Sequence, residues 1–155
     1  METIKVLYKQ PYKDCEIIEV PNDFSEIKKL VDCRTVEGVT FPLDRNVLML
    51  IDDDGKLEKL DGNFFIPEYQ DCTVGNCVFV QVDEDGDFTS LSGHQINKIK
   101  KYLKHFSLAD GEDLWGEDGL YLIAKNIKKY EKLMNEGELW LIKGSLLKDN
   151  LQANL

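Results

Sequence analysis

The stretch Cys77-Val78-Phe79-Val80-Gln81-Val82 is the strongest strand candidate in the chain. β-Branched and aromatic residues favour extended backbone, and here they follow one another almost without a break. The acidic segment 83–87 then leads into a second extended run at 88–91. The stretch and its turn therefore predict an antiparallel hairpin.

Further strands are predicted on the N-terminal side of this hairpin. Apolar and polar residues alternate over residues 3–8, which is typical of a half-buried strand. A turn signal that begins at Pro11 pairs this strand with residues 15–20. Two more strands are expected, at residues 35–41 and 47–51.

Helices are predicted where capping residues precede apolar residues at helical spacing. Asp23 and Glu26 match a cap of the form D-x-x-E, and Ser92 with Gln95 forms a capping box. A third apolar stripe runs from about Leu120 to Met134.

We therefore predict an α+β fold, a mainly antiparallel sheet with about three helices packed on one side of it. Residues 1–106 are expected to form the α+β domain. Residues 107–155 are expected to form a C-terminal extension of helical and strand segments packed on that domain.

The charge of the chain is strongly negative and unevenly distributed. The formal net charge is −10, and residues 1–91 hold 20 acidic and 9 basic residues. Direct binding of nucleic acid through phosphate contacts is therefore not expected. Two interpretations stay open: solvated turns of a soluble domain, or an acidic surface that engages a basic partner.

Several familiar motifs fail when tested. Asp83-Glu84-Asp85-Gly86-Asp87 resembles part of a calcium loop, but Gln81 and Ser92 would occupy positions 1 and 12, which need an Asp-type ligand and a bidentate Glu. A hairpin turn fits better. No phosphate-binding glycine motif or catalytic dyad is recognisable, so we expect no enzyme. With no signal peptide and no apolar run near ~18 residues, we expect a cytoplasmic protein without a membrane partner.

Four cysteines are the candidate metal ligands. Cys72 and Cys77 have C-x4-C spacing, and Cys15 and Cys33 could complete a four-thiolate Zn²⁺ site that ties distant segments together. Alternatively, all four are small buried hydrophobic residues. The zinc interpretation gives the alternative function, a small structural or regulatory zinc protein with no inhibitory role.

The candidate partner-binding residues are the acidic turns and one tryptophan. Trp115 lies in an acidic loop without periodic apolar neighbours, which is typical of an exposed anchor. The complete set predicted to contact a partner is Asp52, Asp53, Asp54, Asp83, Glu84, Asp85, Asp87 and Trp115.

Several short segments, in this order and spacing, resemble a family of small acidic proteins of phages, prophages and plasmids that is catalogued as a domain of unknown function. The matching segments are Ile4-Lys5-Val6-Leu7 with Pro11, Glu19-Val20-Pro21-Asn22-Asp23 leading into Lys29-Leu30-Val31, Asp54-Gly55-Lys56-Leu57 with Leu60 and Asn63, Asp71 to Gly75 with Val78-Phe79-Val80, and Phe88-Thr89-Ser90-Leu91-Ser92 with Gln95-Ile96. The chain departs from this pattern at Cys33, Cys72 and Cys77.

The resemblance implies an accessory protein of a phage or mobile element that inhibits a host defence system. An anti-CRISPR role is the form we expect, in which the protein blocks DNA binding or loading of a type II RNA-guided nuclease. Such nucleases hold nucleic acid in a positively charged channel, which an acidic surface can occupy.

Overall fold

The main sheet of the protein is antiparallel throughout. The structure, a computed structural model, describes residues 2–69 and 71–109. The sheet has the order β2-β1-β7-β4-β3, with the short β8 paired to β7. Its strands are β1 (Thr3–Lys9), β2 (Glu16–Pro21), β3 (Val36–Thr40), β4 (Val47–Asp52), β7 (Cys77–Val82) and β8 (Phe88–Thr89). The two predicted hairpins, β1–β2 and β7–β8, are both confirmed.

A second, two-stranded sheet lies beside the main one. It pairs β5 (Gly62–Ile66) with β6 (Asp71–Val74), and the short 3-10 helix η1 (Pro67–Tyr69) joins them. The sequence did not predict this pair of strands. The side chain of Asn63 holds it in place, donating to the carbonyl oxygens of Lys9 at 2.9 Å and Gly75 at 2.8 Å.

The two α-helices begin at the predicted caps. In α1 (Phe24–Val31), the Asp23 carboxylate accepts from the backbone N–H of Ser25 at 3.0 Å. In α2 (Gly93–Phe106), Ser92 and Gln95 form the reciprocal capping box. These side chains satisfy backbone donors that the first turn of a helix leaves unpaired. No helix in the part of the chain that the structure describes is long and apolar enough to cross a membrane.

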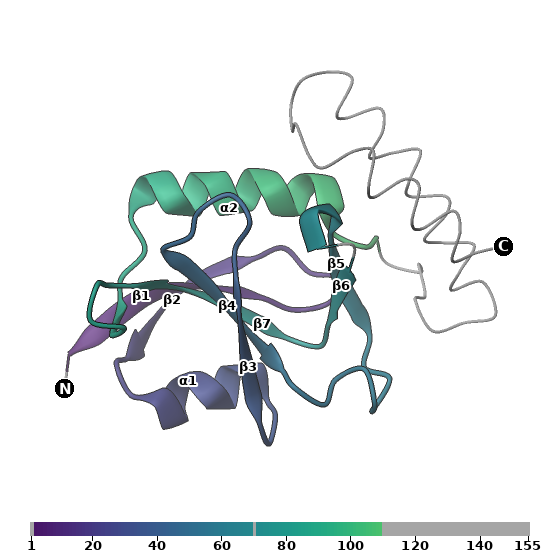
Figure 1. Ribbon diagram of the computed structural model, residues 1–155, viewed down its shortest axis with the longest axis horizontal. Coiled ribbons are helices and arrows are strands. Elements are labelled where there is room, and N and C mark those ends of the chain that lie inside the picture. The colour runs from purple at the N-terminus through teal and green to yellow at the C-terminus, as the bar shows by residue number, and fades with distance from the viewer. Residues whose placement is uncertain (1, 70, 110–155) are drawn as a thin grey trace, which may run out of the picture.

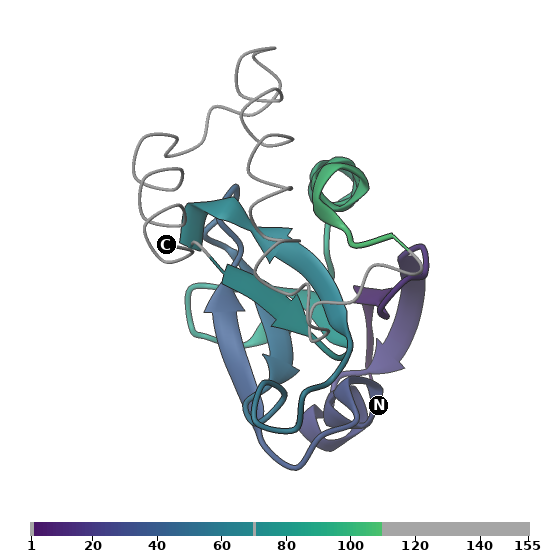
Figure 2. The same ribbon diagram turned by 90° about the vertical axis from the view of Figure 1, so that its right-hand side faces the viewer.

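The helices cover opposite faces of the main sheet, as Figures 1 and 2 show. Successive residues of β7 point to opposite faces: Cys77 and Phe79 enter the core beneath α2, and Val78 and Val80 enter the core beneath α1. We call these the α2-side core and the α1-side core. The expectation of helices on one side was wrong, because a strand that is apolar on both faces needs a cover on each.

The number of helices also differs from the expectation of about three. Two α-helices occur in the described ranges, and the α+β class is confirmed. The predicted third helix and the proposed 107–155 extension lie almost wholly outside the described residues. Ser107 and Leu108 are described, and both join the domain: Ser107 forms a bridge with Phe64, and the Leu108 N–H donates to the Asn63 carbonyl at 3.0 Å.

A carboxylic acid is held against the α2-side core. The Tyr102 hydroxyl, on a fully buried side chain, donates to Oε1 of Glu68 at 2.6 Å. Oε2 of Glu68 is buried and has no hydrogen-bond partner. Burial raises the pKa of Glu68 above its ordinary value, and the Tyr102 hydrogen bond offsets only part of this effect.

Replacing Glu68 with Gln should stabilise the protein at neutral pH. The pKa of Glu68 is higher in the folded state than in the unfolded state, so its protonated form favours folding. This contribution to stability is fully present below the unfolded-state pKa and is lost as the pH rises through the folded-state pKa. The Tm difference between Glu68→Gln and the wild type should therefore grow from about pH 4 to about pH 7 in thermal melts. The exposed Glu58→Gln is the control and should show no such trend. A pH-independent difference would contradict this account.

Candidate functional site

The β7–β8 hairpin presents its acidic residues in a fixed arrangement. The N–H of Asp83 donates to the Asp87 carbonyl at 2.9 Å, and Gly86 takes a positive φ of 85° that a glycine adopts without strain. Oδ1 of Asp83 accepts from the backbone N–H groups of Asp85 and Asp87, both at 2.9 Å. The predicted hairpin turn is confirmed, and the carboxylate of Asp83 is part of what shapes it.

The carboxylates of this hairpin converge. Ligand oxygens of Asp83, Asp85 and Asp87 lie within 4.8 Å of one another, and all three residues are exposed. Among residues 2–69 and 71–109 they are the only such group of three or more acidic, histidine or cysteine side chains. Glu84 is exposed beside them, and none of the ion pairs formed by the described residues involves the hairpin. The hairpin is therefore a compact and unneutralised patch of negative charge.

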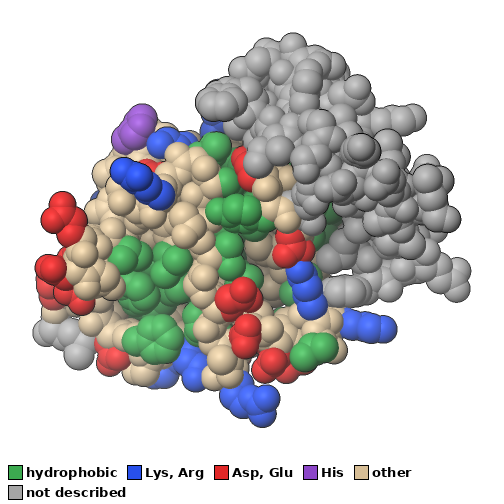
Figure 3. Space-filling view, viewed as in Figure 1, with side chains coloured by type: hydrophobic (Ala, Val, Ile, Leu, Met, Phe, Trp, Pro, Cys, Tyr) green, Lys and Arg blue, Asp and Glu red, His purple; other side chains and the backbone are tan. Residues whose placement is uncertain are grey.

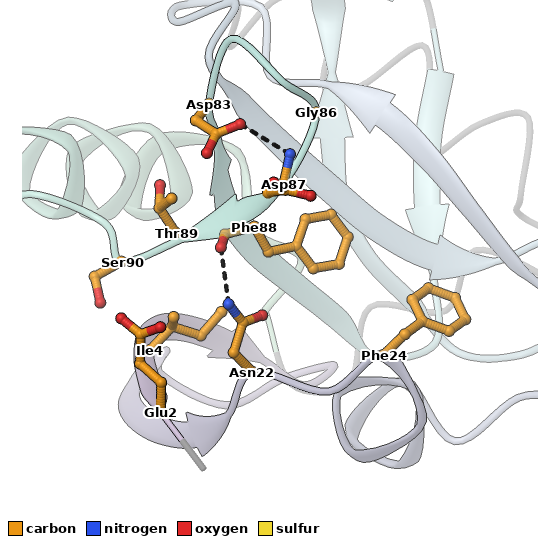
Figure 4. Close-up of a pocket in the computed structure, with 10 residues that line it drawn as sticks. All are labelled: Glu2, Ile4, Asn22, Phe24, Asp83, Gly86, Asp87, Phe88, Thr89 and Ser90. Carbon is orange, nitrogen blue, oxygen red and sulfur yellow. Dashed lines mark hydrogen bonds between the residues drawn. The ribbon is translucent and has the colours of Figure 1, made fainter.

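A groove adjoins this patch. It has a volume of about 820 Å³ and runs between the start of β1, the start of α1 and β8. Its lining residues include Asp83, Asp87, Phe24 and Phe88. The side chain of Asn22, which also lines the groove, connects two of its segments by donating to the Phe88 carbonyl at 3.0 Å. Figure 4 shows both phenylalanine rings in the groove, with the two aspartates beyond Phe88.

Phe24 is an exposed aromatic residue at the start of α1. It is 52% exposed, whereas Ile27 and Val31 of the same helix are buried. Phe24 is the first residue of α1, so its side chain lies at the rim of the α1-side core. In the space-filling view, acidic side chains gather along one edge of the molecule with hydrophobic side chains next to them (Figure 3).

The second predicted acidic turn has a different character. Asp52 is buried, and its Oδ1 accepts from the Asp54 N–H at 2.9 Å. Oδ2 of Asp54 lies 3.5 Å from a guanidinium nitrogen of Arg34, and Asp54 is only partly exposed. Asp53 is the one exposed acid of the three. Val47 pairs with Gln81, so this turn lies at the far end of β4 from the hairpin, roughly 17 Å away by strand rise. The two acidic turns do not form one surface.

The structure does not bring the four cysteines together. Cys15, Cys72 and Cys77 belong to the α2-side core or pack against it, whereas Cys33 packs against the α1-side core on the other face of the sheet. Burial raises the pKa of all four thiols, that of Cys72 to about 12. A four-thiolate zinc site needs all four sulfur atoms within one coordination shell, and Cys33 lies on the other face of the sheet from Cys15, Cys72 and Cys77.

The thiols should react slowly with iodoacetamide at neutral pH, in an order set by burial. We expect Cys15 and Cys33, which are partly exposed, to be alkylated first, and Cys72 and Cys77 to react only as the protein unfolds. Mass spectrometry of timed samples measures this order. Rapid labelling of Cys77 in the folded protein would contradict it.

The remaining predicted contact residue, Trp115, lies outside the described residues. A family model described as a domain of unknown function (DUF3846) matches residues 4–107 of the chain. This range covers the acidic hairpin, its groove except for Glu2, and both cores except for Leu108. No curated protein and no solved structure matches the chain.

Proposed function

The chain belongs to the DUF3846 family, and we propose that it is a non-enzymatic binding protein of a phage or mobile element that inhibits a host nucleic-acid-directed defence protein. The target in this proposal is a type II RNA-guided nuclease of the bacterial cytoplasm. Inhibition would occur by direct contact that blocks DNA binding or loading, without binding of nucleic acid by the inhibitor itself.

The observation that carries the proposal is the converging trio of exposed carboxylates beside an apolar groove. Clefts that hold nucleic acid are lined with lysine and arginine, because each turn of duplex presents closely spaced phosphates. Three carboxylate groups with oxygens within 4.8 Å offer a comparable local charge density. An acidic surface of this kind competes for such a cleft.

The groove adds an apolar contact surface beside the charged hairpin. Partly exposed aromatic residues such as Phe24 and Phe88 are the type of side chain that anchors protein interfaces. Acidic residues at the edge of such an apolar centre steer encounter and fix register, while the apolar contact supplies affinity. The combination fits a partner surface that carries basic residues around an apolar side chain.

Neutralising the hairpin should weaken binding to the nuclease. The variant Asp83→Asn, Asp85→Asn, Asp87→Asn removes three charges, and the new amide oxygen at position 83 can still accept the two backbone hydrogen bonds that the carboxylate of Asp83 accepts. We expect affinity for a purified, guide-loaded type II nuclease to fall by about tenfold or more, measured by biolayer interferometry.

A matched control removes the same charge elsewhere. Glu37→Gln, Glu58→Gln, Asp61→Asn alters three exposed acids that lie away from the hairpin, and it should change affinity by less than about twofold. Equal losses in both variants would show that net charge, and not the hairpin, matters. No binding of the wild type to the nuclease would refute the proposed partner.

Binding should also depend strongly on salt. If paired opposite charges drive association, affinity should fall by about tenfold or more between low and physiological ionic strength, as the Debye length shortens to about 8 Å. The hairpin variant should show a shallower dependence. A flat response in the wild type would exclude mimicry of DNA charge.

A further inference from the structure

A second pocket lies on the opposite side of the domain from the acidic groove. It has a volume of about 660 Å³ and opens between the β1–β2 turn and the C-terminal half of α2. Four lysines, Lys9, Lys13, Lys100 and Lys104, line it, and Asp14 is the only acid among its described lining residues. We propose that this pocket binds a small organic phosphate, independently of the proposed inhibitory function.

Lys9 gives the pocket a built cationic group. The residue is 2% exposed, and its ammonium donates to the carbonyl of Gln10 at 2.7 Å and to Oδ1 of Asn63 at 2.8 Å. Both acceptors are neutral, and within the described ranges no carboxylate forms an ion pair with Lys9. Burial lowers the pKa of Lys9 because the charged form loses hydration, and an anion bound in the pocket would stabilise that charged form.

The three other lysines reach the same pocket from two segments. Lys13 lies on the β1–β2 turn, and Lys100 and Lys104 lie one helical turn apart on α2. Cys15 lines the pocket together with Lys9 and Lys100. None of the three surface lysines is paired with an acid among the described ion pairs.

Helix stability explains only part of this arrangement. Lys104 lies in the last turn of α2, where a cation favourably meets the helix dipole. Lys9 lies in a strand and Lys13 in a turn, so the dipole accounts for neither. Lys9 pairs with Cys77 at the start of β7, whereas the acidic hairpin follows Val82 at the end of that strand, roughly 17 Å away by strand rise. Charges farther apart than about 8 Å are largely screened at physiological salt. The local excess of positive charge therefore decides which ligand enters.

The remaining lining residues indicate an organic ligand. Tyr12 and Leu103 give the pocket an apolar side, and Tyr12 is held at a φ of 63°, a strained backbone conformation for a bulky residue. Ligand pockets for small molecules have volumes of about 300–1,000 Å³ and combine an apolar lining with a few polar groups. Several lysines around one pocket favour the doubly charged phosphate group over a single carboxylate.

Phenyl phosphate is a suitable probe, with inorganic phosphate and phenol as its two halves. Calorimetry on the full chain should show that phenyl phosphate binds, that inorganic phosphate binds more weakly, and that phenol does not bind. Lys100→Gln and Lys104→Gln should each weaken binding by about fivefold or more. Lys101→Gln removes the same charge from an exposed neighbour on α2 outside the pocket lining, and should weaken it by less than about twofold.

Alkylation of the cysteines provides a second readout without any mutation. Phenyl phosphate should slow the reaction of Cys15, which lines the pocket, and leave Cys33, on the other face of the sheet, unchanged. Absence of binding at about 5 mM ligand, an equal effect of Lys101→Gln, or equal protection of both cysteines would each overturn the proposal.

Discussion

Burial of β7 on both faces is the constraint on which the rest of the structure depends. Phe79 packs beneath α2, Val78 packs beneath α1, and both are fully buried. Each face of the strand needs its own cover, so the chain must place one helix on each side of the sheet. That requirement separates the molecule into two sides with different chemistry, an acidic groove next to α1 and a lysine-lined pocket next to α2.

Helix caps and tight turns could be predicted from the sequence, because each depends on residues that are close together in the chain. The caps at Asp23 and Ser92 and the acidic hairpin depend on a few neighbouring residues, and the structure has each of them. The pairing of β5 with β6 could not be predicted, because Asn63 holds it through contacts with Lys9, 54 residues away. The nearly continuous apolar run of β7 does carry a signal for covers on both faces, because a strand with one solvated face shows alternating polar residues instead.

The candidate site was predictable in its charge and not in its shape. The acids of the hairpin are recognisable in the sequence as a charged turn between two extended runs, whereas the groove joins residues from Glu2 to Ser90 that only the fold brings together. Asp52 shows that an acidic run in the sequence does not establish an exposed charge. Asp52 is buried, and its carboxylate accepts a hydrogen bond within the turn. The cysteines likewise share a spacing that suggests a metal, while the sheet separates Cys33 from the others.

The central claim is that the acidic surface and nucleic acid compete for one site on a defence nuclease. A competition assay tests this most directly: binding of target DNA by a guide-loaded type II nuclease is measured as this protein is added, and the order of addition is then reversed. The account predicts that each ligand excludes the other: this protein lowers the apparent affinity of the nuclease for DNA, and DNA lowers its apparent affinity for this protein. A ternary complex that holds the nuclease, the DNA and this protein together would contradict it.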